Sequence, residues 1–231
     1  HLWQALGFAI LLCCQADAAT SPTSVDIPTE GLSSSPAPLK AVLFQPEGQG
    51  PHPAVVMLHG CGGAYARGGA LNARHQMWGE FLAQQGYMAL MLDSFSARGI
   101  KELCTILIKN RMLKETDRVG DAYAALNYLQ TRSDVRAKAV GLLGWSHGGG
   151  VILDAITRPP NGADQFKAAV AFYPGCTSRL RRANRFHPYA PLLILMGDSD
   201  YWTPVAPCKA LVNSVAARYE PMQIATFPDT F

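Results

Sequence analysis

Residues 144–150 constrain the fold of this chain more than any other part of its sequence. They read Gly-Trp-Ser-His-Gly-Gly-Gly, follow the apolar run 139–143 and precede a helix-like run. Gly-x-Ser-x-Gly between a strand and a helix is typical of a sharp turn that holds a serine hydroxyl out at the end of a sheet. Gly144 and Gly148 supply the small residues that so close an approach of strand and helix requires. We therefore predict that Ser146 is a nucleophile; the alternative is a glycine-rich turn whose serine only caps a helix.

Strand-like and helix-like runs alternate along the rest of the chain. Most strand-like runs are continuously apolar, as expected for strands that are covered on both faces. We predict strands over residues 39–44, 54–58, 87–92, 139–143, 168–172, 192–196 and 223–227, and helices over residues 72–85, 113–131, 149–156 and 204–219. This alternation predicts one α/β domain with a mainly parallel sheet covered by helices on both faces.

The first 38 residues differ from the rest. Residues 1–18 hold an apolar run too short to span a bilayer, followed by the small-x-small pattern of a cleavage site. We interpret them as a secretory signal that lacks its beginning, since a basic start and an initiator methionine are absent; an apolar tail packed on the domain is the alternative. Residues 19–38 are rich in Ser, Thr and Pro, which predicts a flexible linker before a domain at 39–231. We expect a periplasmic or secreted protein without stable membrane insertion.

Four cysteines follow the expected signal: Cys61, Cys104, Cys176 and Cys208. An oxidising compartment allows disulfides, and four cysteines permit three pairings. Cys176 and Cys208 follow two successive predicted strands at the same edge of the sheet, which favours that pair. Isolated buried thiols are the alternative.

The charge pattern argues against nucleic acid as a partner. The net charge is +3 and the charges are dispersed. One dense basic cluster, Arg179, Arg181, Arg182 and Arg185, indicates either a solvated loop or a site for an acidic group of a substrate. The histidines and cysteines lack metal-ligand spacing and no phosphate-binding glycine loop occurs, so we predict no metal and no cofactor.

An acyl-transfer serine needs an oxyanion hole, a base and an orienting carboxylate. Residues 59–63, His-Gly-Cys-Gly-Gly, directly follow a predicted strand, and their small side chains let the backbone pass close to the serine. We predict that the backbone amides of Cys61 and of His147, the residue after the nucleophile, bind the oxyanion. A glycine turn without chemistry is the alternative for Cys61.

The carboxylate is expected just after a later strand, where Asp198 and Asp200 are the candidates. Asp198 adjoins the strand end and suits a turn. Asp200 lies further out, where the loop can swing back towards the serine, and we favour it; the alternative is that these aspartates only form the turn.

No histidine of the sequence suits the role of base. The expected order is Ser, Asp, His, and none of the six histidines follows Asp200. His147 adjoins Ser146 at a helix start, where neighbours do not face each other. His59 is better suited to orienting the oxyanion turn, and His187 to a loop contact.

Together these residues resemble the dienelactone hydrolase family of α/β-hydrolases over residues 39–231. The resemblance rests on five motifs: His59-Gly60-Cys61-Gly62-Gly63, Asp93-Ser94-Phe95-Ser96-x-Arg98-Gly99, Gly144-Trp145-Ser146-His147-Gly148-Gly149, Phe172-Tyr173-Pro174-Gly175 and Gly197-x-x-Asp200-x-x-x-Pro204. It implies the α/β-hydrolase fold and Asp200 rather than Asp198 as the triad acid. The founding members carry a cysteine where this chain has Ser146, so their substrate range is not carried over.

A second departure from the family concerns the base. Family chains of this type continue a Phe/Tyr-Pro-x-x-x segment directly into the triad histidine, and here that segment is residues 227–231. The resemblance therefore implies the histidine at the first position past Phe231, with a final helix after it. We expect the chain to be truncated at both ends and, as given, to be a poor catalyst.

These observations predict a serine hydrolase that cleaves a small carboxylic ester or lactone through an acyl-enzyme on Ser146. Trp145 and Trp202 indicate either a partly apolar acyl pocket or core packing. A non-catalytic binding protein on a hydrolase scaffold and a peptidase of the same fold are the alternative functions. The natural ester and the oligomeric state are left open.

Overall fold

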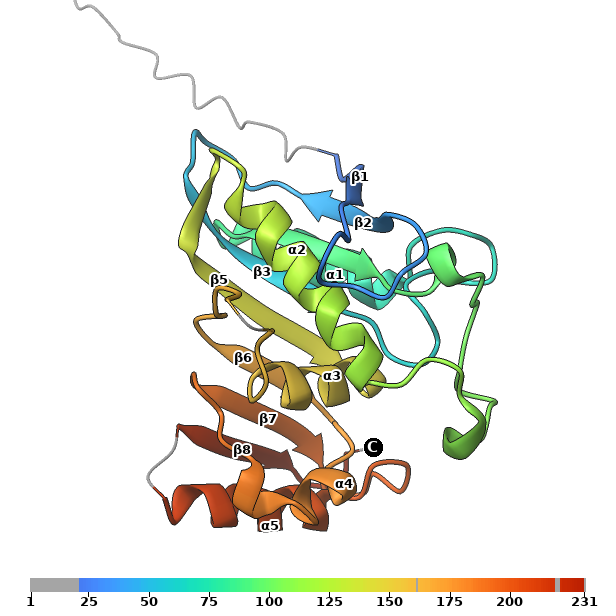
Figure 1. Ribbon diagram of the computed structural model, residues 1–231, viewed down its shortest axis with the longest axis vertical. Coiled ribbons are helices and arrows are strands. Elements are labelled where there is room, and N and C mark those ends of the chain that lie inside the picture. The colour runs from blue at the N-terminus through green and yellow to red at the C-terminus, as the bar shows by residue number, and fades with distance from the viewer. Residues whose placement is uncertain (1–20, 161, 219–220, 231) are drawn as a thin grey trace, which may run out of the picture.

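The computed structural model describes residues 21–160, 162–218 and 221–230, and the expected signal at 1–18 lies outside them. The described residues form one eight-stranded sheet in the order β1-β2-β4-β3-β5-β6-β7-β8 (Figure 1). The strands are β1 (Thr23–Ile27), β2 (Leu39–Phe44), β3 (His52–Leu58), β4 (Met88–Asp93), β5 (Val135–Trp145), β6 (Ala169–Phe172), β7 (Leu192–Gly197) and β8 (Met222–Phe227). The pairs β1–β2 and β2–β4 are antiparallel, and every pair from β4 onward in the sheet order is parallel. The predicted mainly parallel sheet is confirmed.

Helices cover both faces of the sheet, as predicted, but unequally. They are α1 (Ala73–Gln84), α2 (Val119–Gln130), α3 (His147–Ala155), α4 (Thr177–Leu180) and α5 (Val205–Ala216), with 3-10 turns at Ser96–Arg98, Ile108–Asn110, Thr116–Arg118 and Ala183–Arg185. In Figure 1, α2 and α3 lie in front of the sheet and α1 lies behind it. None of these helices is long and apolar enough to cross a membrane.

The alternation of side chains along the strands produces two cores. Leu192, Ile194 and Met196 of β7 are buried in the larger core, with the inner faces of α2, α3 and α5. On the opposite face α1 packs over the middle strands, with Met57 and Trp145 in the smaller core. Strands buried on both sides explain the continuous apolar runs of the sequence.

The linker predicted at residues 19–38 is wrong for its described part, because residues 23–27 form β1. The strand is short, and only Val25 and Ile27 point inward, so its polar composition hides it. The residues that follow are also packed. Ser33 donates a hydrogen bond to Asp121 of α2, and the carbonyl of Leu32 fills the space beside Gly120.

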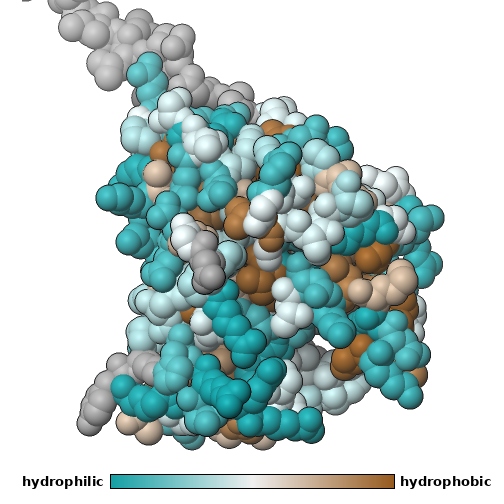
Figure 2. Space-filling view, in the orientation of Figure 1, coloured by the Kyte–Doolittle hydropathy of each residue, from teal (hydrophilic) through white to brown (hydrophobic). Residues whose placement is uncertain are grey.

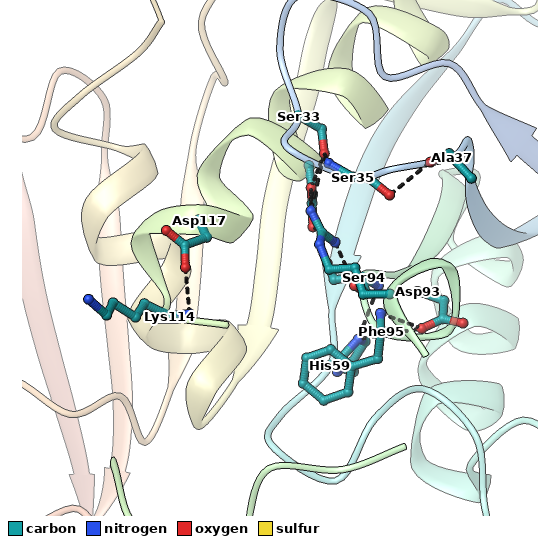
Figure 3. Close-up of polar contacts among 11 residues, drawn as sticks. Ser33, Ser35, Ala37, His59, Asp93, Ser94, Phe95, Lys114 and Asp117 are labelled. Atoms are coloured by element: carbon teal, nitrogen blue, oxygen red, sulfur yellow. Dashed lines mark hydrogen bonds and ion pairs between the residues drawn. The ribbon is translucent and has the colours of Figure 1, made fainter. Parts of the chain in front are cut away.

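The helix predicted over residues 113–131 begins later than predicted, at Val119. The carboxylate of Asp117 accepts the amide of Lys114, which closes a turn before the helix can start (Figure 3). The other predicted helices keep their places within a few residues. Pro204, predicted in the first turn of a helix, is the residue that precedes α5.

Two disulfides link segments that follow strands of the sheet. Cys176 pairs with Cys208, as the sequence favours, although Cys208 lies within α5 rather than at a strand end. Cys61 pairs with Cys104. The alternative of isolated thiols is excluded for all four residues.

Candidate active site

Ser146 occupies a sharp turn between β5 and α3. Its backbone angles are φ 52° and ψ −114°, a left-handed conformation that costs energy for any residue other than glycine. The Ser146 amide donates to the carbonyl of Phe172 at 2.9 Å, and its carbonyl accepts from Gly150 at 2.9 Å. These bonds hold the strained turn in place, as the predicted elbow requires.

The glycines on either side of the serine have no room for a side chain. A Cβ on Gly144 would lie 3.0 Å from the Leu58 carbonyl oxygen and 3.0 Å from the backbone of Gly148. A Cβ on Gly148 would lie 2.2 Å from the same Leu58 oxygen. The predicted close approach of strand, helix and the end of β3 is therefore confirmed.

The turn of residues 59–63 lies beside the elbow. A Cβ on Gly60 would be 3.5 Å from the Cβ of Ser146. Cys61, Ser146 and His147 line one cavity of about 420 Å³. The amide of His147 has no acceptor within its helix because it stands at the first helical position. In the described part of the chain the Cys61 amide donates to no other group, so both amides are free to bind an oxyanion.

His59 holds the start of this turn and is itself fully buried. Its Nδ1 contacts the carbonyl of Gly60 at 2.7 Å, and its Nε2 accepts the amide of Ser94 at 3.2 Å. Figure 3 shows the ring between the loops that follow β3 and β4. Burial and the charge of Arg118 hold the pKa of His59 well below its ordinary value. A neutral ring that orients the turn agrees with the role that the sequence suggests.

The side chain of His147 is buried and is bonded to Arg118. Its Nδ1 accepts from the guanidinium of Arg118 at 2.8 Å, and its ring also contacts the backbone of Leu113. Burial and the Arg118 charge lower the pKa of His147 to about 2. The ring is neutral and its Nδ1 is already bonded to Arg118, so His147 does not suit the role of base.

The remaining described histidines are engaged elsewhere. His75 is buried, with its Nδ1 3.0 Å from the carbonyl of Ala64. His187 contacts the carbonyl of Asn184 at 3.1 Å, and His52 accepts the amide of Gly50 at 2.9 Å.

Asp200 follows β7 and anchors its own loop. Its Oδ1 accepts the amides of Trp202 and Thr203 at 2.8 and 2.9 Å, and its Oδ2 accepts the Thr203 hydroxyl at 2.7 Å. Its charge also acts on Tyr173, whose pKa is raised mainly by burial. Turn formation and service as a triad acid are compatible here, because Oδ2 is a two-lone-pair acceptor with one donor.

Asp198 has a different neighbour. Its Oδ1 accepts the amide of Asp229 at 2.9 Å, and the amide of Ser199 donates to the carbonyl of Thr230 at 3.1 Å. These bonds fasten the turn after β8 to the start of the loop that carries Asp200. Asp198 therefore ties two loops together, as its proximity to the strand end suggests.

The sheet sets the spacing between serine and acid. Ser146 follows β5 and Asp200 follows β7, with β6 between them. Two strand spacings amount to about 10 Å, which leaves room for an imidazole ring between a hydroxyl and a carboxylate.

The cavity beside Ser146 has apolar and basic walls. Ile108 and Trp202 line it and are 79% and 69% exposed. Figure 2 shows hydrophobic side chains gathered on the side from which the loop of residues 105–113 projects in Figure 1. Charged residues of the lining are Arg111, Lys114, Arg179 and Arg181, together with one acidic residue, Glu115. Trp145, in contrast, is 2% exposed and packs in the core.

Arg179 is not available to a substrate in the way that the basic cluster suggested. It is buried, and its guanidinium lies 2.6 Å from Glu115 and 2.5 Å from Asp154. It also donates to the carbonyls of Gly150 and Gly175. It therefore braces α4 against α3. Of the four arginines, Arg179 and Arg181 line the cavity, and Arg181 is the exposed one of these two.

Sequence reasoning missed Arg118 and the loop of residues 101–114. Arg118 is fully buried and donates through one nitrogen to both the His59 carbonyl and the His147 ring. It thus joins the two halves of the candidate oxyanion hole. Its position inside the helix predicted over residues 113–131 gave no signal of this, because its partners lie far away in the chain.

The described residues contain no group of three or more His, Cys, Asp or Glu side chains arranged to hold a metal ion.

A model of the dienelactone hydrolase family matches residues 39–231. The chain is 30% identical over 192 residues to a probable 2-oxo-3-(5-oxofuran-2-ylidene)propanoate lactonase from Bradyrhizobium sp, covering 77% of this chain and 69% of that protein.

Solved structures show the same fold. A Klebsiella pneumoniae protein provisionally named a dienelactone hydrolase superposes with a TM-score of 0.72 at 19% identity, covering 91% of this chain and 87% of that one. Esterase 2 of Thermogutta terrifontis superposes with a TM-score of 0.67 at 17% identity, covering 93% and 85%.

Proposed function

The chain belongs to the dienelactone hydrolase family of hydrolases, and we propose that it cleaves carboxylic esters or lactones through an acyl-enzyme on Ser146. The observation that carries the proposal is the strained backbone of Ser146, φ 52°, beside two unoccupied amides. Strain at a non-glycine residue persists only where the surroundings enforce it, and it gathers at active sites.

In the proposed reaction the Ser146 oxygen attacks the carbonyl carbon while its proton passes to a histidine. The amides of Cys61 and His147 stabilise the negative oxygen of the tetrahedral intermediate. The histidine then protonates the leaving alkoxide, and the acyl group stays on Ser146. Water, deprotonated by the same histidine, releases the acid. A lactone gives a single hydroxy acid, since its alcohol remains attached to the acyl group.

We place this base in the segment that follows β8, at the position after Phe231. The turn of residues 228–230 supports this, because Asp198 and Ser199 bond it to the start of the Asp200 loop. The end of β8 is thereby held next to the loop that carries the proposed acid. The described histidines are bound elsewhere, which also favours this assignment.

The proposed substrate carries an acidic group near its ester. Arg111, Lys114 and Arg181 border the cavity, and none of them forms an ion pair with a carboxylate of the described residues. The lactonase from Bradyrhizobium sp is named for a propanoate, and that name supports the same chemistry. Ile108 and Trp202 would contact the apolar part of the substrate.

The test uses the full-length protein and a fluorophosphonate, which reacts with activated serines. Wild type should be labelled stoichiometrically and should hydrolyse aryl esters and lactones, and Ser146→Ala should lose both properties. Absence of labelling in folded wild type would favour a non-catalytic binding protein. Faster cleavage of peptides than of aryl esters would favour a peptidase.

We also propose export to an oxidising compartment. Two disulfides support this, because such bonds persist mainly in secreted and periplasmic proteins. Fractionation of cells that produce the full-length protein tests the localisation; a cytoplasmic protein with four reduced cysteines would contradict it.

A further inference from the structure

The candidate oxyanion amide belongs to a residue that is also half of a disulfide. Cys61 bonds covalently to Cys104, 43 residues along the chain, in the loop after β4. The same loop contacts the turn at two further points. The amide of Leu103 donates to the Cys61 carbonyl at 2.7 Å, and a Cβ on Gly63 would lie 2.8 Å from the Lys101 carbonyl.

The turn needs such a tether because of its composition. Three of the five residues from 59 to 63 are glycines, and Gly63 adopts a φ of 83°. Glycine gives the backbone more conformational freedom than any other residue. An oxyanion donor acts only if it is held at the position where charge develops. Hydrogen bonds from Ser94 and Arg118 fix His59, the first residue of the turn. Cys61, in contrast, is fixed by the loop of residues 101–104.

We propose that the Cys61–Cys104 disulfide is a positioning group for the Cys61 amide, so that Cys104 serves ester hydrolysis through Cys61. This inference rests on the proposed function. Without the covalent link, the Leu103 amide remains as one hydrogen bond to the Cys61 carbonyl, and the turn gains freedom to move its amide out of line. The disulfide should therefore stabilise the transition state more than it stabilises the bound substrate.

The second disulfide of the chain provides a matched control. Cys176–Cys208 closes a loop of 32 residues, compared with 43 for Cys61–Cys104. Removing either bond should therefore raise the conformational entropy of the unfolded chain by a similar amount. It does not touch the oxyanion turn. Cys61 and Cys176 both line the cavity, but Cys61 is 9% exposed, whereas Cys176 and Cys208 are 2% and 0% exposed. A soluble dithiol should therefore reduce the Cys61–Cys104 bond first.

The experiment compares Cys61→Ala/Cys104→Ala with Cys176→Ala/Cys208→Ala in the full-length protein. Ester hydrolysis is measured well below each unfolding temperature, and the fraction of active enzyme is set by stoichiometric fluorophosphonate labelling. We expect the first variant to lose at least about tenfold in kcat, with KM changed less than about threefold. We expect the control to keep kcat within about twofold while losing thermal stability.

Chemical reduction provides a reversible version of the same test. A dithiol transfers two electrons and two protons to the disulfide, which yields two thiols while the reagent forms its own disulfide. Activity should fall with the appearance of two thiols per chain and return on reoxidation.

Equal kcat for wild type and for Cys61→Ala/Cys104→Ala would refute the positioning role of the disulfide, even if hydrolysis still depends on Ser146. Equal losses of kcat in both variants would also overturn it, because general destabilisation would then suffice. Failure of Ser146 labelling in wild type would instead refute the proposed function.

Discussion

Replacing Arg179 by Met tests whether this arginine braces the site or binds substrate. In the structure its guanidinium compensates two carboxylates, the partly buried Glu115 at 2.6 Å and the buried Asp154 at 2.5 Å. Breaking a buried ion pair from one side costs about 3–5 kcal/mol, because an uncompensated charge stays behind. We expect the free energy of unfolding to fall by about 4 kcal/mol at neutral pH, which for a domain of this size lowers Tm by about 8–16 °C.

The loss of unfolding free energy in Arg179→Met should become smaller as the pH falls. Burial already raises the pKa of Glu115 in spite of the neighbouring Arg179, and removal of the cation should raise it further. A carboxyl whose folded-state pKa lies above its unfolded value is destabilising where it is ionised, at high pH. The penalty disappears as the pH falls towards the unfolded value, about 4.3 for Glu. The difference between wild type and Arg179→Met should therefore be largest at neutral pH and smaller at about pH 5.

The assay is denaturant unfolding of both proteins at the two pH values, with Arg182→Met as the control. Arg182 is exposed, so its variant should stay within about 0.5 kcal/mol of wild type. The bracing role of Arg179 is refuted if its variant is as stable as wild type, or if the loss grows as the pH falls. An unchanged stability combined with a raised KM for a carboxylate-bearing ester would identify Arg179 as a substrate ligand instead.

Three further predictions concern the acid, the elbow around Ser146 and the cavity wall. Asp200→Asn should lower kcat by about 10⁴-fold through misorientation of the base, whereas Asp198→Asn should lower it far less; equal losses in steady-state hydrolysis would contradict the choice of Asp200. Gly148→Ala should cost at least about 3 kcal/mol in urea unfolding, because its Cβ would lie 2.2 Å from the Leu58 oxygen; a stable, fully labelled variant would disprove the tight elbow. Trp202→Ala should raise KM for hydrophobic esters without lowering Tm, since Trp202 is 69% exposed; an unchanged KM would remove it from the acyl site.

The sequence alone predicts those features of the site that depend on local geometry. The elbow is recognisable because steric crowding at Gly144 and Gly148 recurs wherever a strand turns so sharply into a helix. The parallel sheet is recognisable because burial on both faces removes the polar alternation. The pairing of Cys176 with Cys208 could be anticipated from the order of the strands that bring their segments to one edge.

Features that depend on partners distant in the chain were not predictable. Nothing near Arg118 indicates that one of its nitrogens would reach both His59 and His147. The role of Arg179 could not be predicted either, because the sequence does not distinguish a buried arginine that forms ion pairs from an exposed arginine of a basic cluster. β1 was missed because its pairing with β2, rather than its own polar composition, makes it a strand.

β1 also affects how the domain should be produced in the laboratory. It occupies the outer hydrogen-bonding edge of β2, an apolar strand that would otherwise present unpaired amides and carbonyls to solvent. Exposed edges of that kind invite pairing between molecules and aggregation. The match to the family begins only at residue 39, so a clone trimmed to that boundary would lose the five residues that shield the sheet. Expression of the domain without aggregation therefore calls for a start upstream of Thr23.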